Sequence, residues 1–332
     1  MTRLVQIRNG AERRVALVEE PRLCLLRGVP SVVALAHQAL EGATPLTRLV
    51  EELKTEDTLD YDRVYHGESA WLLLPPIDHA EPARCLVSGT GLTHLGSAKN
   101  RNAMHEGGPA AETDSMKMFR WGMEGGRPEA GQIGIAPEWF FKGTGLILHA
   151  HGAVLDVPGH AEEGGEEAEI AGVYLISAEG RPCRIGMAVG NEFADHRFEK
   201  RNYLNLAASK IRNCSLGPEL VVDPDFQSVP GEAVIERNGG IVWRKEIATG
   251  ETEMCHSLAN IEHHHFKFET HRRPGDVHVH YYGAHSLSFG DGVELAHGDV
   301  MCVRFEGFGR PLRNALRVAP RVDAPVVVQS LA

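Results

Sequence analysis

Residues 165–176 read Gly-Glu-Glu-Ala-Glu-Ile-Ala-Gly-Val-Tyr-Leu-Ile, and this stretch holds the strongest structural and chemical signal in the chain. Its apolar part, residues 170–176, is typical of a buried β-strand. Because successive strand side chains point to opposite faces, we expect Glu167 and Glu169 to face the same way. Two buried carboxylates repel each other unless a cation or a shared proton neutralises them. The stretch therefore predicts half of a metal site with oxygen ligands.

A third carboxylate and a lysine follow downstream. Glu192 comes shortly after the apolar run at residues 185–189. Three carboxylates without a paired thiol form a hard oxygen set, which suits Mg²⁺, Mn²⁺ or Ca²⁺ better than Zn²⁺, and magnesium is our first expectation. Lys210 ends a short helical stretch, and a lysine beside a bound cation can act as a base. An exposed lysine at a helix end is the alternative interpretation.

Composition limits the possible partners. The 332 residues include 45 acidic and 34 basic ones, a net charge of -11, which argues against a nucleic-acid or anionic membrane surface. The N-terminus lacks a signal-peptide pattern, and no run of about 18 apolar residues occurs. Six cysteines show no paired short spacing and are expected to be reduced. We therefore expect a cytoplasmic protein whose partner is a small molecule.

The first part of the chain has the pattern of a small α/β domain. Two short strands at 4–7 and 15–18 flank an Asn-Gly turn, which predicts a hairpin. Ser31 can cap a helix that runs to about residue 40, and a second helical pattern covers 46–53. The dipeptide Pro75-Pro76 ends these patterns. We expect one domain at 1–75 and a second at 76–332.

The second part is rich in glycine and in short β-type runs. Strands are expected at 139–142, 145–148, 170–176, 185–189, 241–245, 277–282 and 300–305, and helices at 198–209 and 258–268. Together the two parts predict an α+β protein.

Taken in order, these motifs resemble the fumarylacetoacetate hydrolase superfamily. The matching pieces are Glu167-Ala-Glu169, Asn191-Glu192, Lys210, Leu216-Gly217-Pro218, Pro274-Gly275-Asp276-Val277, Gly298-Asp299-Val300 and Leu312-Arg313-Asn314, over about residues 85 to 316. The resemblance implies a catalytic domain built as a mixed β-roll or sandwich. It also implies that Glu167, Glu169 and Glu192 bind Mg²⁺, or Mn²⁺ or Ca²⁺, and that the protein is a homo-oligomer, a dimer or a tetramer.

The chain departs from the family pattern at several positions. Glu192 stands where the family usually has aspartate, one methylene shorter. His94 matches the family's histidine near the start of the catalytic domain, but Ser97 stands where many members have its partner glutamate. Val87 stands where true fumarylacetoacetate hydrolases have a fourth carboxylate ligand. These departures favour dehydration over hydrolysis of a carbon–carbon bond.

Further candidates come from a strand and two loops. Alternation places Glu138, Phe140 and Lys142 on one strand face, which offers an acid/base carboxylate and an anion-binding lysine, although the polar face of an edge strand is the alternative. Tyr282-Gly283-Ala284 replaces the family's substrate-contacting Thr-Gly-Thr turn. The expected catalytic residues are Lys210, Glu138 and His94, with the roles of base and acid left open. The expected substrate contacts are Lys142, Ser88, Gly89, Thr90, Gly283, Ala284 and Ser286.

A group of histidines suggests a second metal site. His278 and His280 share a strand face, and His263 or His264 could join them. No cysteine or carboxylate is placed to complete such a site. We expect these histidines to form buried hydrogen bonds or subunit contacts.

The resemblance and its departures favour a metal-dependent dehydratase of a 2-keto-3-deoxy sugar acid. The expected substrate is the five-carbon 2-dehydro-3-deoxy-D-arabinonate, and the product 2,5-dioxopentanoate, in non-phosphorylative pentose catabolism. One alternative is a hydrolase of acylpyruvates and other 2,4-diketo acids, or a decarboxylase of the oxaloacetate type. Another is a sugar-acid-binding protein that does not catalyse a reaction.

Overall fold

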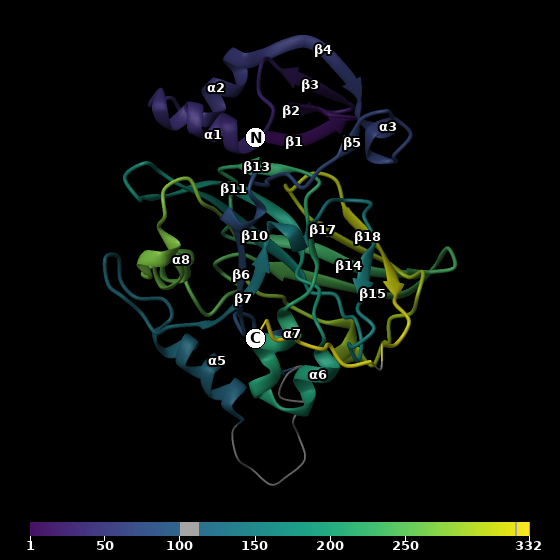
Figure 1. Ribbon diagram of the computed structural model, residues 1–332. Helices are drawn as coiled ribbons and strands as arrows, with labels where there is room; N and C mark the ends of the chain where they lie inside the picture. The colour runs from purple at the N-terminus through teal and green to yellow at the C-terminus, as the bar shows by residue number, and fades with distance from the viewer. Residues whose placement is uncertain (100–112, 323, 332) are drawn as a thin grey trace.

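A computed structural model describes residues 1–99, 113–322 and 324–331 of the chain. Over these residues the chain forms two β-sheets with helices around them (Figure 1). The strands of the larger sheet are β1 (Thr2–Asn9), β2 (Glu12–Glu19), β3 (Arg22–Leu26), β4 (Lys54–Asp60), β5 (Leu72–Leu73), β6 (Cys85–Gly91), β7 (Glu138–Thr144), β8 (Leu148–His149), β10 (Ala168–Ile176), β11 (Pro182–Asn191), β12 (Cys214–Leu216), β13 (Leu220–Val222) and β16 (Val277–Tyr281).

The smaller sheet has the order β15-β14-β17-β18-β9. Its strands are β9 (Leu155–Val157), β14 (Val229–Arg237), β15 (Gly240–Thr249), β17 (Val300–Phe305) and β18 (Leu312–Val318). The α-helices are α1 (Val32–Glu41), α2 (Leu46–Leu53), α3 (Tyr61–Tyr65), α5 (Asp114–Gly125), α6 (His196–Arg201), α7 (Leu206–Lys210) and α8 (Leu258–Phe266). The 3-10 turns include η3 (Tyr203–Asn205) and η5 (Ser288–Asp291). No helix among the described residues is long and apolar enough to span a membrane.

The N-terminal region forms the predicted hairpin and both predicted helices. β1 and β2 pair in antiparallel register around the Asn-Gly turn. Ser31 Oγ caps α1 by accepting a hydrogen bond from Ala34 N at 3.1 Å. The buried Gln6 links this region together, because its Oε1 accepts from Val32 N at 2.8 Å while its Nε2 donates to Pro75 O at 2.7 Å.

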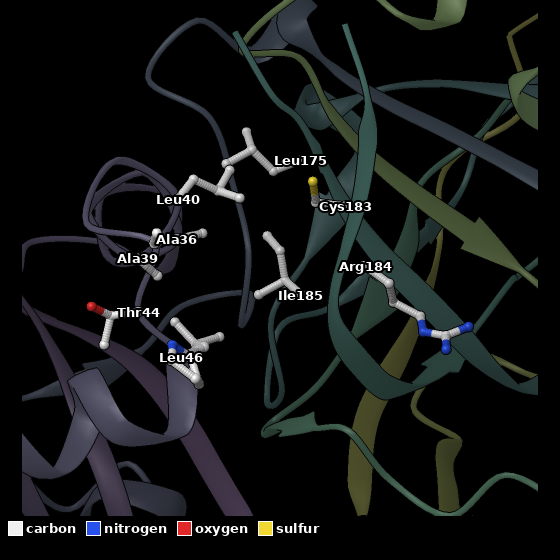
Figure 2. A pocket seen from close by; sticks show the side chains of 11 residues that line it. Ala36, Ala39, Leu40, Thr44, Leu46, Leu175, Cys183, Arg184 and Ile185 are labelled. Carbon is white, nitrogen blue, oxygen red and sulfur yellow. The ribbon is translucent and has the colours of Figure 1, made fainter. Parts of the chain in front are cut away.

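The larger sheet runs from the N-terminal region into the rest of the chain. Its main path is β4-β3-β2-β1-β13-β11-β10-β16-β6-β7, and the β1–β13 pairing makes the connection. A pocket of about 350 Å³ lies where α1 and α2 pack beside the β10–β11 hairpin (Figure 2). Leu40 and Leu46 line it from the helices, and Leu175 and Ile185 from the strands. The predicted division near residue 75 stays a prediction, while the sheet itself continues through both parts.

The core has two main layers, and β10 lies between them with all nine residues buried. Ala171, Val173 and Leu175 pack into the cluster that extends toward α1. Ala168 and Ile170 pack into the cluster formed with the smaller sheet. Because both faces of β10 are covered, carboxylates at its start lie in a buried environment.

Two sequence predictions were wrong in detail. The helix expected at 198–209 is interrupted, because Asn202 is extended and its side chain accepts a hydrogen bond from Leu204 N at 2.9 Å. The chain therefore forms α6, η3 and α7 in place of one helix. The strand expected at 145–148 is a 3-10 turn over Gly145–Ile147 followed by the two residues of β8.

Candidate metal centre and active site

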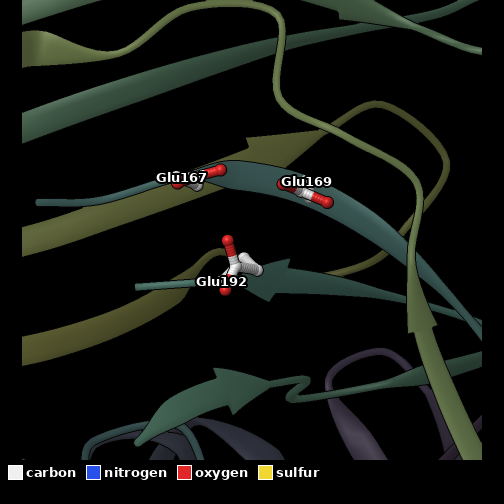
Figure 3. Close-up of side chains that lie close together, drawn as sticks. All are labelled: Glu167, Glu169 and Glu192. Carbon is white, nitrogen blue, oxygen red and sulfur yellow. The ribbon is translucent and has the colours of Figure 1, made fainter. Parts of the chain in front are cut away.

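Glu167, Glu169 and Glu192 meet at one end of the β10–β11 pair (Figure 3). Glu192 N donates to Glu167 O at 2.9 Å, and the buried Asn191 accepts at its Oδ1 from Glu167 N at 3.1 Å. One carboxylate oxygen of each glutamate lies within 4.8 Å of the other two. In the described part of the chain this is the one group of three or more side chains that could bind a metal ion.

The charges at this site oppose one another. Burial and the negative charges of Glu167 and Glu192 raise the pKa of Glu169 well above its ordinary value. Burial also raises the pKa of Glu192 to about 7, although Lys142 and Lys210 oppose the shift. Burial acts in the same direction on Glu167, but Lys210 and His196 together outweigh it and hold the pKa of Glu167 well below its usual range. Three buried carboxylates with mutual repulsion fit a hard divalent cation, which would neutralise them together.

Two buried lysines reach these carboxylates. Lys210 Nζ forms ion pairs with Glu167 and Glu192. Lys142 Nζ forms an ion pair with Glu192 and donates to Phe193 O at 2.7 Å and to Lys210 O at 3.0 Å. Lys142 was predicted to contact a substrate. In the structure its ammonium group contacts three protein acceptors, the Glu192 carboxylate and two backbone carbonyls. Its contact with a substrate stays a prediction.

Further hydrogen bonds reach Glu167 and Glu169, and on Glu167 the oxygen is the one that Lys210 also contacts. His196 Nε2 donates to Glu167 Oε1 at 3.0 Å, and Gly283 N donates to Glu169 Oε2 at 2.7 Å. Gly283 has φ of +100°, which favours glycine at this position. Such bonds to carboxylate ligands fix their orientation. The sequence pattern did not single out His196, although it lies only four residues beyond Glu192.

The predicted shared face of β7 is confirmed. Glu138, Phe140 and Lys142 are all buried and alternate with more exposed neighbours. The Phe140 ring lies with its centroid 4.9 Å from Lys210 Nζ. Glu138 Oε2 accepts a hydrogen bond from the Tyr203 hydroxyl at 2.7 Å. Strand β7 therefore contacts the segment that carries η3 and α7 through three alternate side chains.

Ser88 and Thr90 on β6 were expected to contact a substrate, and that contact stays a prediction. Ser88 Oγ and Thr90 Oγ1 lie 3.0 and 2.6 Å from the two ring nitrogens of His280. Their side chains thus face the histidines of β16. Gly89 and Gly91 alternate with them, and a Cβ atom at either glycine would overlap a side chain of β7. The glycines make room for the buried face of β7.

His94 was expected to act as an acid or a base, and that role stays a prediction. It is fully buried, with Nδ1 2.9 Å from Thr93 Oγ1 and Nε2 3.1 Å from Thr249 Oγ1. Burial lowers the pKa of His94 to about 3. Both ring nitrogens are therefore occupied by hydroxyl groups, and Thr249 belongs to the smaller sheet. A proton-transfer role for His94 has no support in these contacts.

The loop after β16 carries three of the expected substrate contacts, and their surroundings differ. Gly283 reaches the metal centre through its backbone N–H, as described above. Ala284 and Ser286 are buried, and Ser286 Oγ lies 3.3 Å from His285 Nδ1. Contact of all three with a substrate stays a prediction.

The other histidines form hydrogen bonds, as expected. Trp139 Nε1 donates to His265 Nδ1 at 3.2 Å, and His265 Nε2 lies 2.9 Å from His278 Nδ1. His264 Nε2 lies 3.0 Å from Gly134 O. These contacts give the ring nitrogens of the buried histidines hydrogen-bond partners within the protein.

No protein-family model matches the sequence, and a sequence comparison with curated proteins gives no match either. Solved structures do match the fold. A fumarylacetoacetate hydrolase from psychrophilic Exiguobacterium antarcticum aligns with a TM-score of 0.61 and 16% identity over 96% of this chain and 100% of that chain. A 2-hydroxyhepta-2,4-diene-1,7-dioate isomerase from Mycobacterium marinum gives 0.57 and 16% over 96% and 99%. The chain therefore has the fold of fumarylacetoacetate hydrolase-type structures, as the resemblance predicted.

A further structure aligns with a higher TM-score than these two. It is 2-keto-3-deoxy-D-arabinonate dehydratase complexed with magnesium and 2,5-dioxopentanoate. It aligns with a TM-score of 0.71 and 16% identity, over 96% of this chain and 100% of that chain.

Proposed function

We propose that the protein belongs to the fumarylacetoacetate hydrolase superfamily and dehydrates a 2-keto-3-deoxy sugar acid. The preferred substrate is 2-dehydro-3-deoxy-D-arabinonate, which would give 2,5-dioxopentanoate. The observation that carries this proposal is the buried group of Glu167, Glu169 and Glu192 with Lys210 against it. The similarity in fold to a dehydratase that binds magnesium and this product supports it.

Glu167, Glu169 and Glu192 would hold Mg²⁺, or Mn²⁺ or Ca²⁺, which supplies electrophilic stabilisation of charge that develops on a 2-keto acid. Lys210 lies against two of these carboxylates and is the proposed base that removes a proton from C3 of the substrate. Glu138 lies on the β7 face next to Phe140, which contacts Lys210, and is the proposed acid.

The proposed chemistry is the loss of one water molecule. Lys210 first takes the C3 proton, and the electron pair is delocalised onto the C2 keto oxygen as an enolate. In a second step that pair forms the C3–C4 double bond, and the C4 hydroxyl leaves as water with a proton from Glu138. Transfer of a proton from C5 to C3 then yields an enol, which becomes the C5 aldehyde. His94 takes no part in this scheme, because hydroxyl groups occupy both of its ring nitrogens.

The test is an assay of purified protein with Mg²⁺ and 2-dehydro-3-deoxy-D-arabinonate, in which trapping of the aldehyde detects 2,5-dioxopentanoate. Chelation of the metal should abolish product formation. The Glu192→Ala variant should lose both Mg²⁺ binding and turnover. Absence of product from every 2-keto-3-deoxypentonate would contradict the proposal.

The same assay separates the alternatives. Cleavage of an acylpyruvate, or release of carbon dioxide from oxaloacetate, would indicate a hydrolase or a decarboxylase. A protein that binds the sugar acid equally well after Glu192→Ala, without turnover, would be a binding protein.

A further inference from the structure

Tyr203 contacts the proposed acid, and neither the sequence motifs nor the metal centre involves it. Its hydroxyl donates to Glu138 Oε2 at 2.7 Å, across 65 positions of sequence. Glu138 is buried, with 5% of its surface exposed, and Tyr203 is half-buried. A hydrogen bond in such a place fixes one carboxylate oxygen more firmly than a contact with solvent does.

The backbone around Tyr203 is held by local hydrogen bonds. Asn202 accepts at its side chain from Leu204 N at 2.9 Å, which closes the 3-10 turn η3. Asn205 Nδ2 donates to Phe198 O at 3.1 Å and ties η3 to α6. Helix α7 follows directly and ends at Lys210, so one short segment carries both the phenol and the proposed base.

Glu138 is confined on its other side by β6. A Cβ atom on Gly91 would overlap Glu138 Oε1, so the carboxylate lies directly against the backbone of that strand. Gly91 and Glu138 are also register partners in the β6–β7 pair. The carboxylate therefore lies between a strand backbone and the Tyr203 hydroxyl, which together define its rotamer.

We propose that Tyr203 is a positioning residue that holds Glu138 for transfer of its proton to the leaving C4 hydroxyl. This inference rests on the proposed dehydration. A carboxyl group that protonates a leaving group must present one oxygen at hydrogen-bond distance, and small displacements reduce the rate. The Tyr203 hydroxyl holds Oε2 of Glu138. Because the carboxyl group is planar and rigid, this contact also fixes the direction in which Oε1 points. Removal of the C3 proton by Lys210 does not use this contact.

The variant Tyr203→Phe removes the hydroxyl and keeps the ring. We expect kcat for dehydration to fall by about 10- to 100-fold, within the range of general acid catalysis, while KM changes by less than about twofold. Exchange of the C3 protons with D₂O, followed by NMR, should persist at close to the wild-type rate. Mg²⁺ affinity, measured by calorimetry, should be unchanged.

Tyr65→Phe is the matched control. Tyr65 is also half-buried, and its hydroxyl donates to a backbone carbonyl, Pro311 O, at 2.8 Å. We expect this variant to keep full activity. A selective loss of dehydration in Tyr203→Phe would support the positioning role.

Two results would overturn the inference. One is a Tyr203→Phe protein with wild-type kcat. The other is a parallel loss of dehydration, C3 exchange, Mg²⁺ affinity and melting temperature, which would show a merely structural role. If the wild-type protein itself releases no product, the proposed function fails and this inference with it. If the wild type is active and only the Tyr203→Phe expectation fails, the proposed function stands.

Discussion

Lys142 is fully buried and has three acceptors around the candidate metal centre. Its ammonium group pairs with Glu192 and donates to the backbone carbonyls of Phe193 and Lys210. Desolvation of two charges is costly, so such a pair depends on both partners being present. Lys142 therefore joins Glu192, a proposed metal ligand, to the backbone of Lys210, the proposed base.

Replacement of Lys142 by methionine should destabilise the metal-free protein. Loss of Lys142 leaves Lys210 as the cation that still pairs with Glu192, so the charge of this buried carboxylate is only partly compensated. We expect the free energy of unfolding to fall by up to about 3–5 kcal/mol. Mg²⁺ should restore part of that loss, because a bound cation neutralises the same carboxylate. Urea unfolding with a chelator and with Mg²⁺ measures both effects. Lys117→Met, which removes an exposed pair with Asp114, is the control and should leave stability unchanged.

His94 should make stability depend on acidity. Its pKa is about 3 in the folded protein, against an ordinary value of 6.5, because burial disfavours the charged ring. Between these values the unfolded chain binds one more proton than the folded one, so stability falls as the pH falls. The slope for one proton is about 1.4 kcal/mol per pH unit.

The variant His94→Gln should reduce the slope of the unfolding free energy against pH by about 1.4 kcal/mol per pH unit, the contribution of one proton. Urea unfolding at about pH 6 and pH 5 measures it, with His160→Gln at an exposed position as the control. An unchanged slope in His94→Gln would show that this histidine does not contribute.

At the level of elements, the pairing of β6 with β7 sets the shape of the site. Gly89 and Gly91 alternate with Ser88 and Thr90, so one face of β6 has no side chains where β7 presents Phe140 and Glu138. This arrangement depends on the register of two antiparallel strands. A side chain at the wrong position would move the buried face of β7.

Gly91→Ala should therefore reduce activity by displacing Glu138. We expect kcat to fall at least about 10-fold, because a small misplacement of a catalytic group is costly, with Mg²⁺ affinity retained. Gly240→Ala is the matched control, since a Cβ atom there has its nearest neighbour, Arg237 O, at 3.7 Å. Steady-state kinetics and calorimetry on both proteins test the expectation. Equal kcat values in the two variants would contradict it.

Sequence patterns predict those features that repeat along the chain. Alternation places Glu167 and Glu169 together, and the apolar run of β10 marks a strand buried on both faces. Periodicity could not show that Asn202 interrupts a helix, because its side chain competes with the backbone for a hydrogen bond. Tyr203 could not be found either, since its contact with Glu138 exists only after distant segments fold together.

The polarity of a residue does not by itself identify its partner. Ser88 and Thr90 look suited to bind a substrate, and in the structure their hydroxyl groups lie against the ring of His280. His94 looks like an acid/base group, and two threonines surround its ring. In both cases the sequence shows the chemistry of a side chain but not the face from which it projects.

For the whole molecule, the N-terminal region is joined to the rest by pairing and by buried charge. Strand β1 pairs with β13 in antiparallel register. Glu219, just before β13, is fully buried and accepts hydrogen bonds from Arg3 Nη1 and the Tyr61 hydroxyl, both at 2.9 Å, and from Arg310 N at 3.0 Å. The hydrogen bonds that satisfy this buried carboxylate therefore come from both the N-terminal region and the rest of the chain.

Removal of residues 1–75 should therefore destabilise the remainder, although a pattern break lies at Pro75-Pro76. The fragment would expose the edge of β13 and leave Glu219 without Arg3 and Tyr61, and an exposed strand edge promotes aggregation. We expect the fragment to elute as aggregates in size-exclusion chromatography. Co-expression with residues 1–75 as a separate chain should restore a defined species and a cooperative melting transition. A monodisperse fragment that melts at the temperature of the full chain would show that the catalytic part folds by itself.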